Sequence, residues 1–314
     1  MSLAYHRLSR ALPSYRWWKP LLALVLAVAS YLVLSTVVVL GVALVVGAVA
    51  GPEELQRLQA ALAYDPLAAA DPLVMTVSLG SIAMMLPAVL LAARVLGRDA
   101  PGRLWSVTGR LRWRWLLRCV PAGLVFVVLS IGLSSVVVPV LLGEPLSPGP
   151  VTTPPAALAA SAIVIVLLVP LQATGEELAF RGLAAQALGA WLPWAAVAIV
   201  LPTVAFALAH DYNVWGVLDV AVFGVGAAFV TWRTGGLEAA IVAHVLNNTA
   251  VFLLLAPFEG VESSDGSPLG LAVTLVSVPV FVLLVLRRAR RDGVARLLPS
   301  PTPVASSPQE APAP

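Results

Sequence analysis

Residues 20–50 read PLLALVLAVASYLVLSTVVVLGVALVVGAVA, about thirty consecutive positions that are almost all apolar. A helix needs roughly 20 predominantly apolar residues to cross the hydrocarbon core of a bilayer. A cleaved signal peptide has a shorter apolar region, and the polar residues that follow position 50 contain no small-residue cleavage site. The stretch therefore predicts a retained transmembrane helix.

The rest of the chain has the same character. Of its 314 residues, 60% are hydrophobic and 11% are charged, whereas a typical soluble domain has about 25% charged residues. So few charges cannot cover the surface of a soluble enzyme, and the composition also excludes a disordered or collagen-like chain. Seven further apolar stretches lie at about 73–96, 120–142, 155–173 (running on towards 189), 191–209, 215–231, 237–256 and 268–286. The fold class predicted is an all-α polytopic membrane protein with about eight transmembrane helices.

Basic residues mark alternate connections between these stretches. They precede the first stretch, fill residues 94–118 and follow the last stretch, whereas residues 51–72 hold one arginine and residues 143–153 hold none. Cytoplasmic segments of membrane proteins carry the excess of Lys and Arg. Both termini are therefore predicted to be cytoplasmic, which requires an even number of spans. The net charge of +3 follows from these flanks, so no nucleic-acid partner is expected.

Four regions are predicted along the chain. Residues 1–154 hold three transmembrane helices and the basic cytoplasmic loop 94–118, and residues 155–256 hold the polar residues considered below. Residues 257–298 hold the last helix with its basic flank, and residues 299–314 form a Pro/Ser/Ala-rich tail that is expected to be disordered.

Ionisable side chains inside spans are costly and usually functional or paired. Here they occur in TGEELAFRG at 174–182, FALAH at 206–210 and HVLNN at 244–248. Residues four apart share a helix face. This spacing pairs Glu177 with Arg181, Phe206 with His210 and His244 with Asn248, and it leaves Glu176 rotated by about 100°.

These groups suit hydrolysis. A carboxylate and an imidazole can deprotonate a water molecule, and a second imidazole and an amide can donate hydrogen bonds to an oxyanion. Glu176, His210 and His244 could instead hold a zinc ion, and the sequence leaves both chemistries open. The single cysteine, Cys119, excludes a multi-cysteine zinc site.

Structural roles are open for the same residues. Glu177 and Arg181 could form a neutralising ion pair, and His210 could be a hydrogen bonder between packed helices. Asp219 has no evident partner, whereas Asp211 and Glu238 lie near span ends and are expected to meet water. At 1.5 Å per residue, Glu176, His210 and His244 fall at different depths, so tilted, broken or re-entrant helices are expected around the site.

Taken together, Glu-Glu-x-x-x-Arg at 176–181, Phe-x-x-x-His at 206–210 and His-x-x-x-Asn at 244–248 resemble the CPBP family. This family contains the type II CAAX prenyl proteases and bacteriocin-immunity (abortive-infection-like) membrane proteins. The resemblance covers about residues 155–256 and implies an intramembrane glutamate-dependent endopeptidase. Metalloprotease motifs of the His-Glu-x-x-His kind and Gly-x-Ser-x-Gly are absent from the sequence.

The resemblance also implies a role for each matching position. Glu176 and His210 would activate water, and His244 and Asn248 would form the oxyanion hole. Arg181 would orient Glu176, Glu177 would assist, and Phe206 would pack near the site.

The substrate expected is a membrane-associated peptide or protein, and the location is the plasma membrane of a bacterial cell. Prenylated CAAX substrates are not expected there. Two other functions stay open: a non-catalytic scaffold or immunity protein that keeps the site, and a proton-coupled transporter that uses the intramembrane acids.

Overall fold

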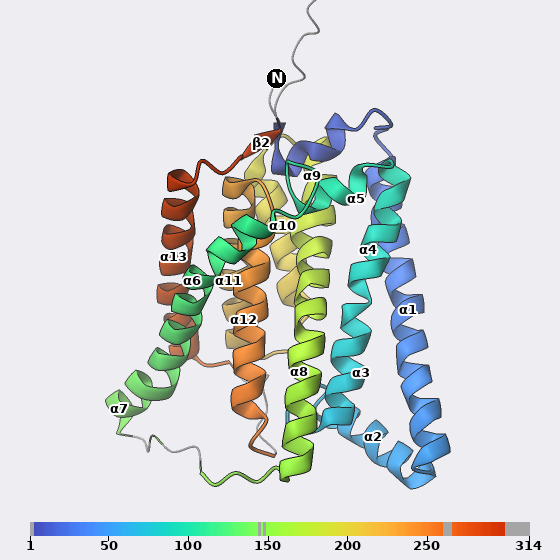
Figure 1. Cartoon of the computed structure of the whole chain (residues 1–314), viewed down its shortest axis with the longest axis vertical. Helices are drawn as coiled ribbons and strands as arrows, with labels where there is room; N and C mark the ends of the chain where they lie inside the picture. Colours follow the sequence, from blue (N-terminus) through green and yellow to red (C-terminus); the bar gives the residue numbers. More distant parts are fainter. Residues whose placement is uncertain (1–2, 144–145, 147–148, 260–265, 299–314) are drawn as a thin grey trace, which may run out of the picture.

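The computed structural model describes residues 3–143, 146, 149–259 and 266–298. Helices form nearly all of it (Figure 1), because a backbone in lipid must satisfy its hydrogen bonds within its own segment. The N-terminal half consists of β1 (Leu3–Ala4), η1 (Tyr5–Ala11), α1 (Lys19–Val49), α2 (Pro52–Tyr64), α3 (Pro72–Ala83), α4 (Met85–Ala93), η2 (Arg94–Leu96), α5 (Ala100–Trp105), α6 (Trp113–Gly132), η3 (Leu133–Val137) and α7 (Val138–Leu142). The C-terminal half consists of α8 (Pro155–Glu176), η4 (Glu177–Ala184), α9 (Ala185–Trp191), α10 (Ala195–Leu208), α11 (Val214–Thr234), α12 (Glu238–Leu255), α13 (Pro268–Arg291) and β2 (Leu297–Leu298).

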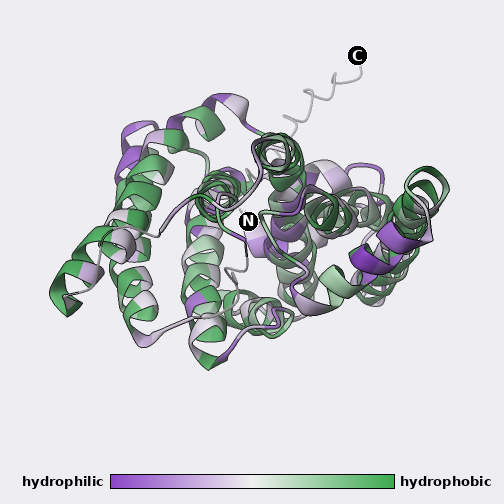
Figure 2. Cartoon of the chain, turned by 90° about the horizontal axis from the view of Figure 1, so that it is seen from below, coloured by the Kyte–Doolittle hydropathy of each residue, from purple (hydrophilic) through white to green (hydrophobic). Residues whose placement is uncertain are grey.

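The polytopic all-α fold is confirmed. Among the described residues, seven helices are long and apolar enough to cross a membrane, and Ala195–Leu208 is a shorter apolar helix of 14 residues. Large apolar side chains are exposed along the outer helices, and most of the helical ribbon in Figure 2 has the green colour of hydrophobic residues. This distribution is typical of a surface that faces lipid rather than water.

The helix predicted at 191–209 is shorter than expected. Trp191 ends α9, and Leu192 takes an extended conformation (φ −111°, ψ 128°) before Pro193. A residue that precedes proline is biased away from helical backbone angles, so α10 begins only at Ala195. Its 14 residues rise about 21 Å. The chain therefore turns at His210, before it has crossed a full bilayer core.

The two ends of the described chain meet. Leu3 and Ala4 pair antiparallel with Leu298 and Leu297, and η1 packs against α9 at the same end of the bundle. Figure 1 shows β2 beside the N-terminal segment, at the end of the bundle where α5 and α9 also lie. This arrangement agrees with an even number of crossings, whereas the cytoplasmic side stays a prediction from the arginine pattern.

Glu238 corrects an expectation. It is fully buried rather than in contact with water, and its carboxylate accepts hydrogen bonds from Nε (2.8 Å) and Nη2 (2.7 Å) of Arg112. Nη1 of Arg112 also donates to the carbonyl groups of Thr234 and Ala295. One guanidinium therefore ties together the start of α6, the end of α11, the start of α12 and the chain after α13. The tail expected to be disordered, 299–314, lies outside the described residues.

Candidate active site

The acidic motif lies where one long helix changes its winding. Residues 155–191 run as α8, η4 and α9, and Glu177–Ala184 adopt π-helical hydrogen bonding. A π-turn within an α-helix is rare and often marks a functional site. The surrounding segment packs closely, because a Cβ added at Gly175 would lie 3.0 Å from the backbone nitrogen of Leu86 in α4.

His244 of α12 lies between the two glutamates. Its Nδ1 is 2.8 Å from Oε1 of Glu177, and its Nε2 is 3.4 Å from Oε2 of Glu176. All three side chains are buried. Two carboxylates adjacent along one helix thus converge on a single imidazole from another helix.

Arg181 pairs with Glu177. Its Nη1 donates to Oε1 of Glu177 over 3.1 Å, which is the i, i+4 pair that the spacing predicts. No contact from Arg181 to Glu176 appears among the described residues, although the resemblance implied that Arg181 orients Glu176. The guanidinium is held from two sides: Cζ lies 4.0 Å from the centre of the Phe206 ring, and Gly224 of α11 leaves room for Nη2.

His210 follows the end of α10. Its Nδ1 lies 2.8 Å from the carbonyl oxygen of Phe206. A carbonyl oxygen can only accept a hydrogen bond, so Nδ1 carries the proton, and Nε2 of a neutral imidazole is left as an acceptor. The ring lies between those of Phe206 (4.7 Å between centroids, 71°) and Tyr212 (5.2 Å, 62°).

Phe206 connects the histidines with the arginine. Besides its contacts with His210 and Arg181, its ring centre lies 6.1 Å from that of His244. Through such contacts the structure brings together six of the seven predicted residues: Glu176, Glu177, Arg181, Phe206, His210 and His244. The depth difference expected between them is absent, because Glu177, Phe206 and His244 are in contact although they lie on η4, α10 and α12.

Asn248 is the seventh predicted residue. It lies one helical turn beyond His244 on α12 and is half-buried. In the described part of the chain its side chain has one polar contact, a 3.4 Å bond accepted from Nδ2 of Asn247. The structure therefore places its amide near the site without bonding it to any of the other six residues.

Sequence patterns did not identify three aromatic neighbours of the site. Tyr212 covers one side of His210, Phe223 of α11 lies 5.3 Å from the His244 ring, and Phe180 lies 5.2 Å from Phe206. Tyr212 follows His210 by two residues beyond the end of α10, so helical spacing could not link them. Asp219 lies one turn before Phe223, and its buried Oδ1 has no hydrogen-bond partner among the described residues.

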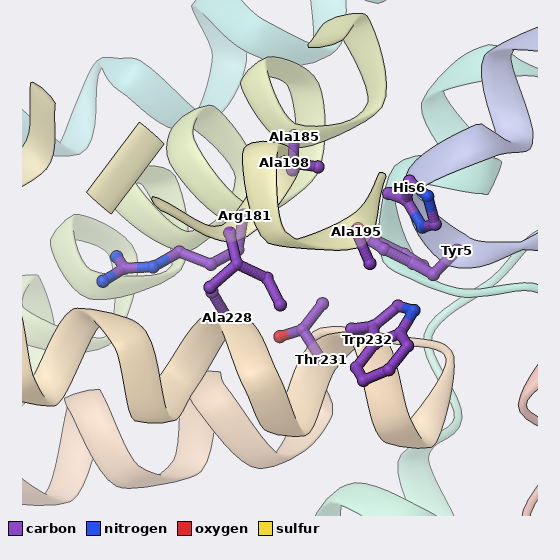
Figure 3. A pocket seen from close by; sticks show the side chains of 10 residues that line it. Tyr5, His6, Arg181, Ala185, Ala195, Ala198, Ala228, Thr231 and Trp232 are labelled. Carbon is purple, nitrogen blue, oxygen red and sulfur yellow. The ribbon is translucent and has the colours of Figure 1, made fainter. Parts of the chain in front are cut away.

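A small cavity lies behind Arg181. Figure 3 shows that it is lined by η1, α9, α10 and α11 residues, and that the guanidinium of Arg181 points away from Tyr5 and His6. Its volume is about 10 Å³, which is enough for about one water molecule. This cavity is therefore too small for anything larger than a water molecule.

The described residues do not converge as metal ligands. Within them, no group of three or more His, Cys, Asp or Glu side chains could hold a metal ion. Nδ1 of His244 is bonded to Glu177, and Nδ1 of His210 is bonded to its own helix. Both bonds leave Nε2 of the histidine available, so it is the separation of the side chains that keeps Glu176, His210 and His244 from forming a zinc site among the described residues.

Comparison with known protein families gives a match over the acidic and histidine motifs. Residues 157–250 match the family model described as type II CAAX prenyl endopeptidase, Rce1-like. The matched segment runs from α8 into α12 and contains all seven predicted site residues. Comparison with curated proteins and with solved structures returns no match.

Proposed function

Because residues 157–250 form an Rce1-like domain of the CAAX protease family, we propose that this multi-pass membrane protein is an intramembrane endopeptidase. It hydrolyses a peptide bond of a membrane-associated peptide or protein, with Glu176 and His210 activating the water. The observation that carries the proposal is that the Glu176 carboxylate is buried and has an oxygen without a hydrogen bond among the described residues. This oxygen is Oε2, which forms no hydrogen bond there although Nε2 of His244 lies 3.4 Å away. A desolvated carboxylate with a free oxygen is suited to accept a proton from water.

Glu177 and Arg181 hold the His244 ring in position in this mechanism. Oε1 of Glu177 accepts a hydrogen bond from Arg181 and lies 2.8 Å from Nδ1 of His244, so it fixes the position of the imidazole. Nε2 of His244 then lies on the side of the ring that faces Glu176, 3.4 Å from Oε2. In the reaction, a proton on this nitrogen makes His244 a hydrogen-bond donor to the oxyanion.

The reaction then balances as a hydrolysis. The water oxygen forms a bond to the carbonyl carbon of the peptide, and its proton passes to Glu176 or to Nε2 of His210. The oxyanion accepts hydrogen bonds from Nε2–H of His244 and from Nδ2 of Asn248, whose Oδ1 is the atom that accepts from Asn247. The base returns the proton to the leaving amine, and the carbon–nitrogen bond breaks.

The test uses Glu176→Gln and His210→Ala in purified protein reconstituted into vesicles with a membrane-anchored reporter peptide. A positioned base contributes about 10²–10⁴-fold to rate, so each variant should lose cleavage by about that factor. Glu53→Gln is the control, because Glu53 is exposed on α2. Circular dichroism and gel filtration establish that the variants fold.

Full cleavage by both variants would remove these two residues from the mechanism. If Glu176→Gln also retains the cellular phenotype of the wild type, the scaffold function is favoured instead. Separate reporters with and without a prenyl group determine whether the substrate class includes CAAX peptides.

A further inference from the structure

A polar cavity of about 390 Å³ lies outside the proposed active site, at the end of the bundle where the two chain ends meet. Its walls come from the turn before α5, from α5 itself, from residues 107–109 and from β2. The side chains that matter for its chemistry are Arg98, Asp99, Arg103, Val107, Thr108 and Leu298.

In the part of the chain that the structure describes, the two arginines of this cavity have no anionic partner. Neither Arg98 nor Arg103 forms an ion pair within the described residues, although Asp99 lies in the same wall. Nε of Arg103 is buried and lacks a hydrogen-bond acceptor there. Arg112, in contrast, donates hydrogen bonds to Glu238 and to two carbonyl groups. A buried guanidinium donor without an acceptor is unusual in a folded protein.

The wall around these arginines is held rigidly. Val107 donates its backbone N–H to the Gly235 carbonyl (2.8 Å), and Ser106 Oγ bonds to the carbonyl of Arg110 (2.6 Å). A Cβ at Gly102 would overlap the carbonyl of Gly109, so α5 and the turn lie in direct contact. The cavity is therefore part of the folded frame rather than a gap between loose surface chains.

The charge and shape of the cavity indicate its occupant. Two guanidinium groups and one carboxylate give a net charge of +1, which matches the single negative charge of a phosphodiester. Guanidinium groups bind phosphate oxygens through paired hydrogen bonds, and Thr108 adds a hydroxyl group. Val107 and Leu298 supply apolar wall beside these groups, as a glycerol backbone requires.

We propose that this cavity binds the phosphate of an anionic phospholipid headgroup. Basic pockets at the cytoplasmic ends of transmembrane helices commonly bind such headgroups, and the arginine pattern predicts that this end is cytoplasmic. The occupant accepts hydrogen bonds from the guanidinium groups of Arg98 and Arg103, which both line the cavity. Free phosphate shares this chemistry, and the experiment separates the two sources.

The test measures binding to the full-length protein in detergent by isothermal titration calorimetry. The probes are dihexanoyl phosphatidylglycerol, dihexanoylglycerol, which lacks the phosphate, and inorganic phosphate. Arg98→Gln and Arg103→Gln should each weaken phosphatidylglycerol binding by about tenfold or more, since each removes a charge-assisted hydrogen bond. The control Arg110→Gln removes an equal charge from an exposed neighbour that does not line the cavity, and it should change binding by less than about threefold.

Each outcome decides the proposal. Binding of phosphatidylglycerol but not of dihexanoylglycerol, with loss in both cavity variants, supports it. Equal losses in Arg110→Gln and the cavity variants, or no binding by the wild type, would overturn it. Inorganic phosphate binding as tightly as the lipid would overturn the lipid assignment. Arg98 is exposed, so its variant remains informative if Arg103→Gln fails to fold.

Discussion

Nδ1 of His244 lies 2.8 Å from Oε1 of Glu177, and the same oxygen accepts a 3.1 Å hydrogen bond from Arg181. Glu177 is therefore the residue that joins α12 to the long helix, although its neighbour Glu176 is the expected catalytic residue. The division of roles has a physical reason. One carboxylate fixes the positions of the imidazole and guanidinium, which leaves the other carboxylate free of permanent donors.

Glu177→Gln is expected to destabilise the protein by about 3–5 kcal/mol, because it leaves the buried guanidinium of Arg181 without a counter-charge. Cleavage should also fall by about 10²-fold, since His244 loses its anchor. Thermal unfolding and reporter cleavage in vesicles measure the two effects. The double variant Glu177→Gln/Arg181→Gln should recover part of the stability but none of the activity. A double variant less stable than Glu177→Gln would show that Glu177 does not stabilise the protein by neutralising Arg181.

Gly224→Ala is expected to displace Arg181. An added Cβ would lie 2.9 Å from Nη2 of Arg181 and 2.8 Å from Cγ2 of Thr203, so these side chains or the helices that carry them must shift. Overpacking of this kind costs about 1–3 kcal/mol, and activity should fall with it. Gly41→Ala is the matched control, because its Cβ would have no neighbour within 4 Å. Equal unfolding temperatures for the two variants would show that Arg181 tolerates the methyl group.

Tyr212 is expected to hold His210 through its ring rather than through its hydroxyl group. Burial raises the pKa of Tyr212 to about 12, so the phenol stays neutral at ordinary pH. Tyr212→Phe should therefore keep both the cleavage rate and its pH profile, whereas Tyr212→Ala should lower kcat by about tenfold or more with little change in KM. Steady-state kinetics from pH 6 to 9 separates the two. A Tyr212→Phe variant as impaired as Tyr212→Ala would assign a role to the hydroxyl group instead.

Acidification is expected to weaken the contact between η1 and the end of the long helix. Burial lowers the pKa of His6 below its usual 6.5, so the unfolded chain binds a proton more readily than the folded one. The stabilisation is fully present above pH 6.5 and is lost as the pH falls through the lowered value. Thermal unfolding measured between about pH 7.5 and 5 should decline less steeply for His6→Gln than for the wild type. Parallel curves would exclude His6 as the titrating group.

Much of this architecture follows directly from the order of the residues. A spanning segment needs only length and apolar side chains, so the stretches around α1, α8 and α13 were predicted within a few residues. Spacing along a single helix also predicted the pairing of Glu177 with Arg181 and of Phe206 with His210, because both pairs depend on local geometry alone.

Contacts between helices depend on features that local patterns do not encode. The bond between His244 and Glu177 joins α12 to the π-turn of η4, across 67 positions of the chain. The burial of Glu238 depends in the same way on Arg112, which is 126 residues away along the chain. Hydrophobicity and helical periodicity depend on residues a few positions apart, so the sequence alone predicts the features that they determine. Helix rotation, tilt and depth are set by packing between distant segments, so only the folded molecule shows which of its few charges meet.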